Sequence, residues 1–443
     1  MTSLSNPAAP FLMTNIQSLR SGFLGPLSLG YEMGDVKDLE DQVEELEKIL
    51  EKDYGDSDGL SSFVELDDLV ALVDPTDLAA LIALGDLSDL SKADIESLGI
   101  TDAEINALVL EGDNEVSRSI SEANSILNNV GETAYIKLSG ALQVPFMPVI
   151  YKTQKHGAFM LDSGLSFVGR VGVLSDDISV RTLDEGVELV SDTAVYLKRA
   201  SDFRIGLGYS QAVGRPVSGA LILGGKINLH QIALGQKLSF LTNEDDSATD
   251  AFGDFLMDRD NVQSGISIDL GAIWTAPNYQ LGVAATSINE PEFDFEELGQ
   301  CNGLSGPELS SCNSTIRLSN KGKLKLKETY KMKAQLKLDA ALMSSNQNWS
   351  LAGSYEVNPV ADAVGDKHQW QTVSLSYFSD NFYFPGVRVG YRKNQAGSQL
   401  SYATVGVTLI RRLDFDIAYG LEKPEGESLP RSVYFSLGYG LAF

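Results

Sequence analysis

The feature of this sequence that most limits its fold is a strict alternation of side-chain types that runs to the last residue. Apolar residues fill every second position from Val433 to Phe443, and Tyr434 with small residues fills the positions between them. Because successive side chains of a β-strand point to opposite faces, this pattern predicts a strand with one apolar face. The same alternation recurs at intervals from about residue 134 to the end of the chain.

The alternating segments are longer than the strands of most soluble proteins. The clearest case runs from Lys323 to Leu342, where apolar residues share one face and lysines line much of the other. Strands of soluble proteins have about five or six residues, whereas a tilted strand needs about 9–11 residues to cross a bilayer. Aromatic residues near segment ends, including Tyr209, Trp274 and Trp349, suit the interfacial girdles of membrane barrels. We therefore expect a transmembrane barrel instead of a soluble sandwich.

The spacing of the segments predicts an all-β transmembrane barrel of about 14 antiparallel strands over residues 131–443. If the last strand ends in the periplasm, short connections such as Ile410–Arg412 fall on the periplasmic side, and long ones such as Gly235–Asn261 fall outside. A turn is expected near Ala200. The candidate strands begin near Ala134, Ala158, Val187, Phe203, Gly219, Val262, Tyr279, Tyr330, Trp349, Gln371, Gly386, Gln399, Leu413 and Arg431.

The last strand resembles the carboxyl-terminal signal that the barrel-assembly machinery of bacterial outer membranes reads. Its apolar face includes Tyr439, Leu441 and the terminal Phe443. The expected location is the bacterial outer membrane, with the lipid bilayer and the assembly machinery as partners. No run of about eighteen apolar residues occurs, so no helical membrane span is predicted.

The negative charge of the chain is concentrated in one segment near the N-terminus. Between Glu32 and Glu122 the chain has 27 acidic and 5 basic residues, a net charge of −22 out of −27 for the whole sequence. Two interpretations stay open, a solvated acidic insert and a docking surface for a basic partner. The excess of carboxylates argues against nucleic-acid binding through an electropositive surface.

The acidic segment has helical periodicity, and we expect a helical hairpin over residues 35–130. Apolar residues follow heptad spacing in Val36–Leu50 and again in Val116–Leu127. Counted back from the C-terminus, fourteen strands place this insert on the periplasmic side, although a strand over Pro26–Met33 would change that count. Residues 1–34 are expected to form a plug or that first strand.

Residue patterns for catalysis or metal binding are weak. The three histidines, His156, His230 and His368, lie far apart in the sequence and outside any metal-ligand spacing. Asp56 to Glu65 match part of a calcium loop, but Tyr54 stands where the first aspartate ligand belongs. No phosphate loop, serine elbow or triad can be argued, so we expect no enzymatic activity, no cofactor and no metal.

The two cysteines, Cys301 and Cys312, lie in the longest connection assigned to the outside, Glu290–Gly322. Two thiols this close in a Gly/Pro/Ser-rich loop of an exported protein predict a disulfide. Two free thiols would instead require a reducing compartment and would count against export.

Short motifs along most of the chain carry a family resemblance. They are Asn6-Pro7-Ala8, Pro26–Tyr31, the acidic insert, Ile288-Asn289, Pro291–Phe293 and the aromatic C-terminus. With them the chain resembles the conjugal-transfer TraF-type family of outer-membrane barrels, which is related to FadL-like channels. Members of this family begin with a signal peptide, whereas Met1 to Leu4 lack its charged and apolar regions. Either the start is misassigned or the chain is trimmed, and an authentic start at Met1 would count against export.

The resemblance implies two functions of different kinds. The first is a structural or accessory role in the cell envelope or in a conjugation apparatus, where the acidic insert contacts periplasmic or conjugation proteins. The alternative is a FadL-like passive channel for a hydrophobic or small solute, with the N-terminal residues as its plug.

Overall fold

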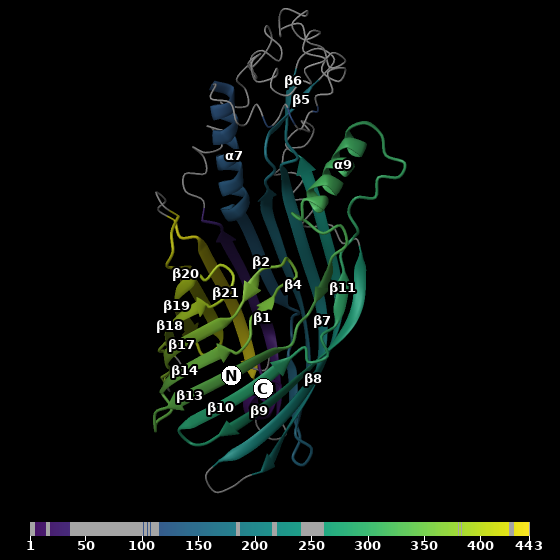
Figure 1. Cartoon of the computed structure of the whole chain (residues 1–443). Helices are drawn as coiled ribbons and strands as arrows, with labels where there is room; N and C mark the ends of the chain where they lie inside the picture. The colour runs from purple at the N-terminus through teal and green to yellow at the C-terminus, as the bar shows by residue number, and fades with distance from the viewer. Residues whose placement is uncertain are drawn as a thin grey trace, which may run out of the picture.

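The structure, a computed structural model, contains one antiparallel β-barrel with extensions at one end (Figure 1). It describes residues 5–14, 18–35, 101, 104, 107, 115–182, 187–214, 219–240, 261–379, 381, 383–424 and 429–442.

The barrel wall is a closed ring with fourteen strand positions, as the alternation predicts. Every wall strand pairs antiparallel with its neighbours, and β1 closes the ring by pairing with both β2 and β21. The short β3 (Val149–Lys152) continues the position of β2 after a break and pairs with β1 and β4. The wall strands are β1 (Leu19–Met33), β2 (Tyr135–Gln143), β4 (Ala158–Leu174), β7 (Ala194–Gly214), β8 (Ala220–Phe240), β9 (Val262–Thr275), β10 (Tyr279–Thr286), β13 (Gln335–Met343), β14 (Trp349–Glu356), β17 (Trp370–Tyr377), β18 (Gly386–Asn394), β19 (Ser401–Leu409), β20 (Leu413–Gly420) and β21 (Ser432–Ala442).

Apolar side chains cover the outside of the wall, while polar and small ones face the lumen. On β8, Ile227 is 52% exposed, and Lys226 and Asn228 on either side of it are buried. Leu207 on β7 and Leu342 on β13 are each 60% exposed. Exposed apolar side chains on this scale would be unfavourable in water but suit a hydrocarbon surrounding.

The strand β1 was missing from the fourteen predicted strands. Its alternation is interrupted by Gly22 and Pro26, and its register against β21 shifts between Gly22 and Leu24 and again between Leu24 and Leu27. These irregularities hide the strand from a period-two pattern, because each bulge moves the following side chains to the other face.

The predicted turn near Ala200 is wrong. It divided one strand into two, and this extra strand offsets the missing β1, so the predicted total of about fourteen still holds. Ala200 lies inside the unbroken strand β7, where it pairs with Val168 of β4 and Leu234 of β8. The candidate strand near Val187 is part of a separate hairpin formed by β5 (Ser179–Thr182) and β6 (Val187–Val190).

The two ends of the barrel differ. Arg20 of β1 pairs with Ala442 of β21, so the first and last wall strands meet at one end, which we call the terminal end. The opposite end, the loop end, carries α7 (Glu115–Thr133), α9 (Gly306–Asn320) and the β5–β6 hairpin (Figure 1). None of the helices in the described ranges is long and apolar enough to cross a membrane.

The acidic segment joins the barrel at the loop end. The N–H of Gly34, after β1, donates to the carbonyl oxygen of Tyr135, just after α7, at 2.7 Å. The prediction that the insert lies at the same end as the C-terminus is therefore wrong at both of its attachment points. The fourteen strands counted after the insert included β7 as two strands, whereas thirteen wall strands follow it, and an odd number places the insert at the opposite end. Most of the predicted 35–130 hairpin lies outside the described residues.

The helix α7 forms over the second of the two predicted heptad patterns. Ile120, Ala123 and Leu127 are at most 4% exposed. Asn124 Oδ1 accepts a hydrogen bond of 2.7 Å from the backbone N–H of Ile178, so the helix is fixed to the connection that follows β4.

The connection between β10 and β13 contains α9 and the predicted disulfide. Cys301 and Cys312 are bonded, with their Cα atoms 5.7 Å apart. The alternating segment that begins at Lys323 does not form one strand, because residues 329–331 form the short β12 and the wall strand β13 begins only at Gln335.

The far end of α9 is held by an ion pair with the connection before β7. The guanidinium of Arg317 donates to both carboxylate oxygens of Asp192, each at 2.6 Å. Burial raises the pKa of Asp192, but the hydrogen bonds from Arg317 and Ser314 outweigh it and leave the pKa below its ordinary value. The contact therefore persists at neutral and mildly acidic pH.

Replacing Cys301 and Cys312 by serine should loosen α9 without opening the barrel. A disulfide across a sequence separation of 11 contributes about 3 kcal/mol at most, largely to local order, and the Arg317–Asp192 pair remains. We expect unheated protein to keep its fast gel migration, while trypsin cleaves after Arg317 faster than in the wild type. Loss of the fast-migrating band would contradict this expectation.

Candidate functional site in the barrel lumen

The N-terminal residues enter the lumen near the terminal end and form a plug, defined here as residues 5–14. Asn6 and Ala8 have no exposed surface, and Ala9 is 2% exposed. The Asn6 side chain donates to the carbonyl oxygens of Ala272 (3.5 Å) and Val283 (3.2 Å), and its Oδ1 accepts from the Ala8 N–H at 2.9 Å. One asparagine thus ties the plug to two wall strands and fixes its own turn.

Two inward-facing glycines make room for the plug. A Cβ atom at Gly224 would lie 2.2 Å from the carbonyl oxygen of Pro7, and one at Gly271 would lie 2.2 Å from Asn6 Oδ1. Larger residues at either position would displace the chain. Beside them, Ala8 and Ala9 pack against Ile222 and Ile273 in one buried cluster.

The second half of the plug is the short helix α1 (Pro10–Met13), which basic side chains from the wall hold in place. Lys152 Nζ donates to the carbonyl oxygen of Phe11 at 2.7 Å and lies 3.9 Å from the centre of the Phe11 ring. Arg20 donates to the carbonyl oxygen of Met13 at 3.0 Å. Residues 1–34 therefore supply both a plug and a wall strand.

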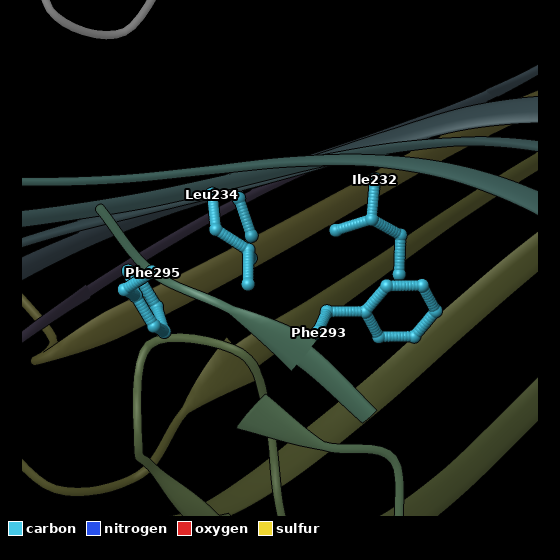
Figure 2. Close-up of a cluster of buried hydrophobic side chains, with 5 residues drawn as sticks. Ile232, Leu234, Phe293 and Phe295 are labelled. Carbon is cyan, nitrogen blue, oxygen red and sulfur yellow. The ribbon is translucent and has the colours of Figure 1, made fainter. Parts of the chain in front are cut away.

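Part of the β10–β13 connection folds back over the lumen at the loop end, and we call its two strand segments, residues 291–296 and 328–332, the cap. Its β11 (Glu292–Asp294) pairs with β12 (Thr329–Lys331). Phe293 and Phe295 are at most 4% exposed and pack against Ile232 and Leu234 of β8 (Figure 2). Lys198 Nζ of β7 contacts the Glu328 carboxylate at 2.7 Å.

A second connection, between β14 and β17, also bends toward the lumen. It contains β15 (Val360–Ala361) and β16 (Lys367–His368). Lys137 Nζ of β2 contacts Asp362 and lies 3.0 Å from Asp366, which also lies 3.4 Å from Arg170 of β4. These ion pairs tie the connection to the opposite wall.

A cavity of about 420 Å³ remains under the two connections. Its lining combines charged groups of the wall with apolar groups of the cap. The lining includes Glu32, Asp202, Tyr330, Met332, Trp370, Arg392 and Tyr434.

Deeper in the lumen, polar side chains of β7, β8 and β9 form a hydrogen-bonded row that the sequence did not reveal. His230 Nδ1 lies 2.9 Å from Asp202 Oδ2, and His230 Nε2 lies 2.9 Å from Ser267 Oγ. Asn228 donates to Ser267 Oγ at 3.0 Å and to Asp269 at 2.8 Å. The Asp-His-Ser order matches a nucleophilic triad, but Ser267 is 1% exposed and gives a substrate no access in this conformation.

The other histidines do not join this row. His156 follows β3 in the turn before β4, and His368 belongs to β16. Among the described residues, no group of three or more histidine, cysteine or acidic side chains could hold a metal ion. The calcium-like residues Asp56 to Glu65 lie outside the described ranges.

The predicted assembly-signal residues belong to the strand that closes the barrel. On β21, Tyr439 is opposite Leu24 and Leu441 is opposite Ser21 of β1. Phe443 lies outside the described residues. Recognition of these three residues by an assembly machinery stays a prediction.

A family model described as "F plasmid transfer operon, TraF, protein" matches residues 3–356. Three solved structures resemble the fold at low sequence identity. A TodX deltaS2S3 mutant monoaromatic hydrocarbon channel has a TM-score of 0.44 and 10% identity, covering 99% of this chain and 94% of that one. A Pseudomonas aeruginosa FadL homologue has a TM-score of 0.31 and 12% identity, covering 98% and 92%. CdiB from Escherichia coli has a TM-score of 0.29 and 11% identity, covering 70% and 53%. No curated protein matches the sequence.

Substituting Asn6→Ala should loosen the plug while leaving the wall intact. The substitution removes the hydrogen bonds to Ala272, Val283 and Ala8. A loss of about 1–3 kcal/mol corresponds to roughly 5- to 150-fold faster amide exchange in residues 5–14. Hydrogen exchange measured by mass spectrometry on the N-terminal peptide checks this. Leu12→Ala, at a side chain that is 40% exposed, is the control and should leave exchange nearly unchanged. Equal exchange in all three proteins would show that Asn6 does not hold the plug.

Proposed function

Because the chain belongs to the F plasmid transfer operon TraF family, whose model matches residues 3–356, we propose that it is an accessory barrel of a conjugation apparatus in the bacterial outer membrane. The closed wall with its apolar outside supports the membrane location, since a barrel without free edges satisfies all its backbone hydrogen bonds internally. The lipid bilayer and the barrel-assembly machinery are the partners that this location implies.

The observation that carries the structural role is that segments of the chain itself occupy the lumen near both ends. Asn6 and the two glycines hold the plug at the terminal end, and the buried Phe293 and Phe295 hold the cap at the loop end. A barrel whose lumen is occupied in this way is suited to present the segments it carries. We therefore place the function in those segments and not in continuous flow through the lumen.

The proposed orientation has the terminal end in the periplasm and the loop end outside the cell. It follows the arrangement of bacterial barrels, in which short turns face the periplasm and long connections face outward. The acidic segment would then be attached at the cell surface, with a basic surface as its partner. This replaces periplasmic docking as the expected contact.

We propose no catalytic activity and no binding of nucleic acid. Within the Asp202–His230–Ser267 row, His230 is 4% and Ser267 1% exposed, and the net charge of −27 disfavours a polyanion.

A passive channel is the second candidate, favoured by the cavity of about 420 Å³ under the cap. In this candidate function the plug and the cap would move aside to widen the path of the solute.

Cysteine labelling in cells tests the orientation. Ser125 is exposed on α7 at the loop end, and Ser345 is exposed in the β13–β14 turn at the terminal end. An impermeant thiol reagent should label Ser125→Cys in intact cells, but Ser345→Cys only after the outer membrane is permeabilised. The native cysteines are bonded to each other and give little background. The reverse pattern would overturn the orientation.

Mating assays test the accessory role. Donor cells without the protein should transfer the plasmid less often, and the wild-type gene should restore transfer. A variant in which a flexible linker joins Gly34 to Glu115 should form a heat-modifiable barrel but fail to restore transfer, because it lacks the acidic segment. Normal plasmid transfer without the protein would refute the accessory role. Full restoration of transfer by the linker variant would show that a part of the barrel other than the acidic segment carries this role.

A further inference from the structure

Arg392 extends from the lumen face of β18 into a group of aromatic rings. Its guanidinium carbon lies 3.5 Å from the centre of the Trp370 ring and 5.4 Å from the centres of the Tyr402 and Tyr434 rings. These rings come from β17, β19 and β21, so four strands converge on one cation. Stacking of this kind contacts the flat faces of a guanidinium, and it leaves the N–H donors at the edge available for other partners.

The N–H donors of Arg392 are not used by the part of the chain that the structure describes. Its Nε is buried without a hydrogen-bond partner, and none of the ion pairs between described residues includes it. The contrast is Arg388, which faces the lumen on the same strand and contacts Asp416 at 2.9 Å and Asp414 at 3.1 Å. A guanidinium has five donors, and buried donors are nearly always paired. Arg392 is one of four described arginines with a buried Nε atom that has no hydrogen-bond partner, and of these four it is the one that lines the cavity.

The acidic groups around the same cavity are already engaged. Glu32 accepts hydrogen bonds from the Tyr135 hydroxyl at 2.6 Å and the Tyr434 hydroxyl at 3.4 Å. Asp202 pairs with His230 at 2.9 Å. The carboxylates of the β14–β17 connection pair with basic residues of the wall, as described above. Arg392 therefore faces the cavity as a cation whose donors can meet an added anion.

We propose that this cavity binds a compact organic carboxylate, with the carboxylate on Arg392 and the apolar body between the Trp370 side of the wall and the cap. Paired N–H groups of arginine match a carboxylate in two-point geometry. The cavity volume of about 420 Å³ lies in the range of small-molecule pockets, roughly 300–1,000 Å³. Tyr330 and Met332 of the cap supply apolar surface opposite the wall. The site is independent of the mating role, because it lies inside the barrel.

Calorimetric titration of the purified full-length protein with benzoate, in a neutral detergent, tests the site. Saturable binding is expected in the wild type. Arg392→Gln should weaken it about tenfold or more, since charge-assisted hydrogen bonds are lost. Benzyl alcohol, which has the ring without the charge, should also bind about tenfold more weakly. Arg388→Gln removes the same charge from the same face of β18, away from the cavity lining, and should leave binding unchanged.

A cavity-filling variant keeps the test valid if Arg392→Gln fails to fold. Ala363 lines the cavity from the β14–β17 connection, and Ala363→Phe should abolish benzoate binding while Arg392 stays in place. Each variant is first checked for heat-modifiable migration. Absence of binding in the wild type, or equal binding by Arg392→Gln, overturns the proposal. Binding of inorganic phosphate without binding of benzoate overturns it too, because the apolar walls would then have no part.

Discussion

The closure of the ring between β1 and β21 is the constraint on which the rest of the molecule depends. A strand in hydrocarbon cannot leave its N–H and C=O groups unpaired, so a membrane sheet is stable only when its first and last strands meet. Here the two strands come from opposite ends of the chain, with Arg20 opposite Ala442 and Tyr31 opposite Val433. Because β1 runs from the terminal end to the loop end, the chain must leave it beside α7. The attachment point of the acidic segment is therefore a consequence of closure.

The lumen follows from the same alternation that makes the outside apolar. Every second side chain points inward, and charged ones can be stabilised by partners on nearby strands. One example is the 2.9 Å contact of Lys226 on β8 with Asp162 on β4, which reaches across β7. Where the plug enters, two inward positions are Gly224 and Gly271, because the Pro7 backbone and the Asn6 side chain occupy the volume that a side chain would fill. The plug therefore fits into the lumen only where the wall has glycine. Elsewhere in the lumen, ion pairs require side chains of opposite charge on facing strands.

Local patterns in the sequence were sufficient for the fold class, the family resemblance and the disulfide, all of which are confirmed. They failed where the period was broken or where contacts are distant. The bulges near Gly22 and Pro26 concealed β1, and the polar residues around Ala200 suggested a turn inside the long strand β7. The Arg392 site joins residues from four strands, and the plug joins Asn6 to Ala272 and Val283. Such groupings depend on strand order and register, which spacing along the chain does not encode.

The unequal heights of the wall connect the barrel to its proposed surface role. β7 and β8 have 21 residues each, whereas β10, β14 and β20 have eight. A tilted strand crosses a bilayer with about 9–11 residues, so the upper half of β7 and β8 must continue beyond the hydrocarbon as paired sheet. The cap is fixed to this raised wall through Lys198 and Glu328, and α9 through Asp192 just before β7. Because an antiparallel sheet resists bending far more than isolated loops do, these extensions hold the loop-end elements in fixed positions. A barrel with a uniformly short wall would carry the same segments on flexible connections and could not present them in one arrangement to a partner.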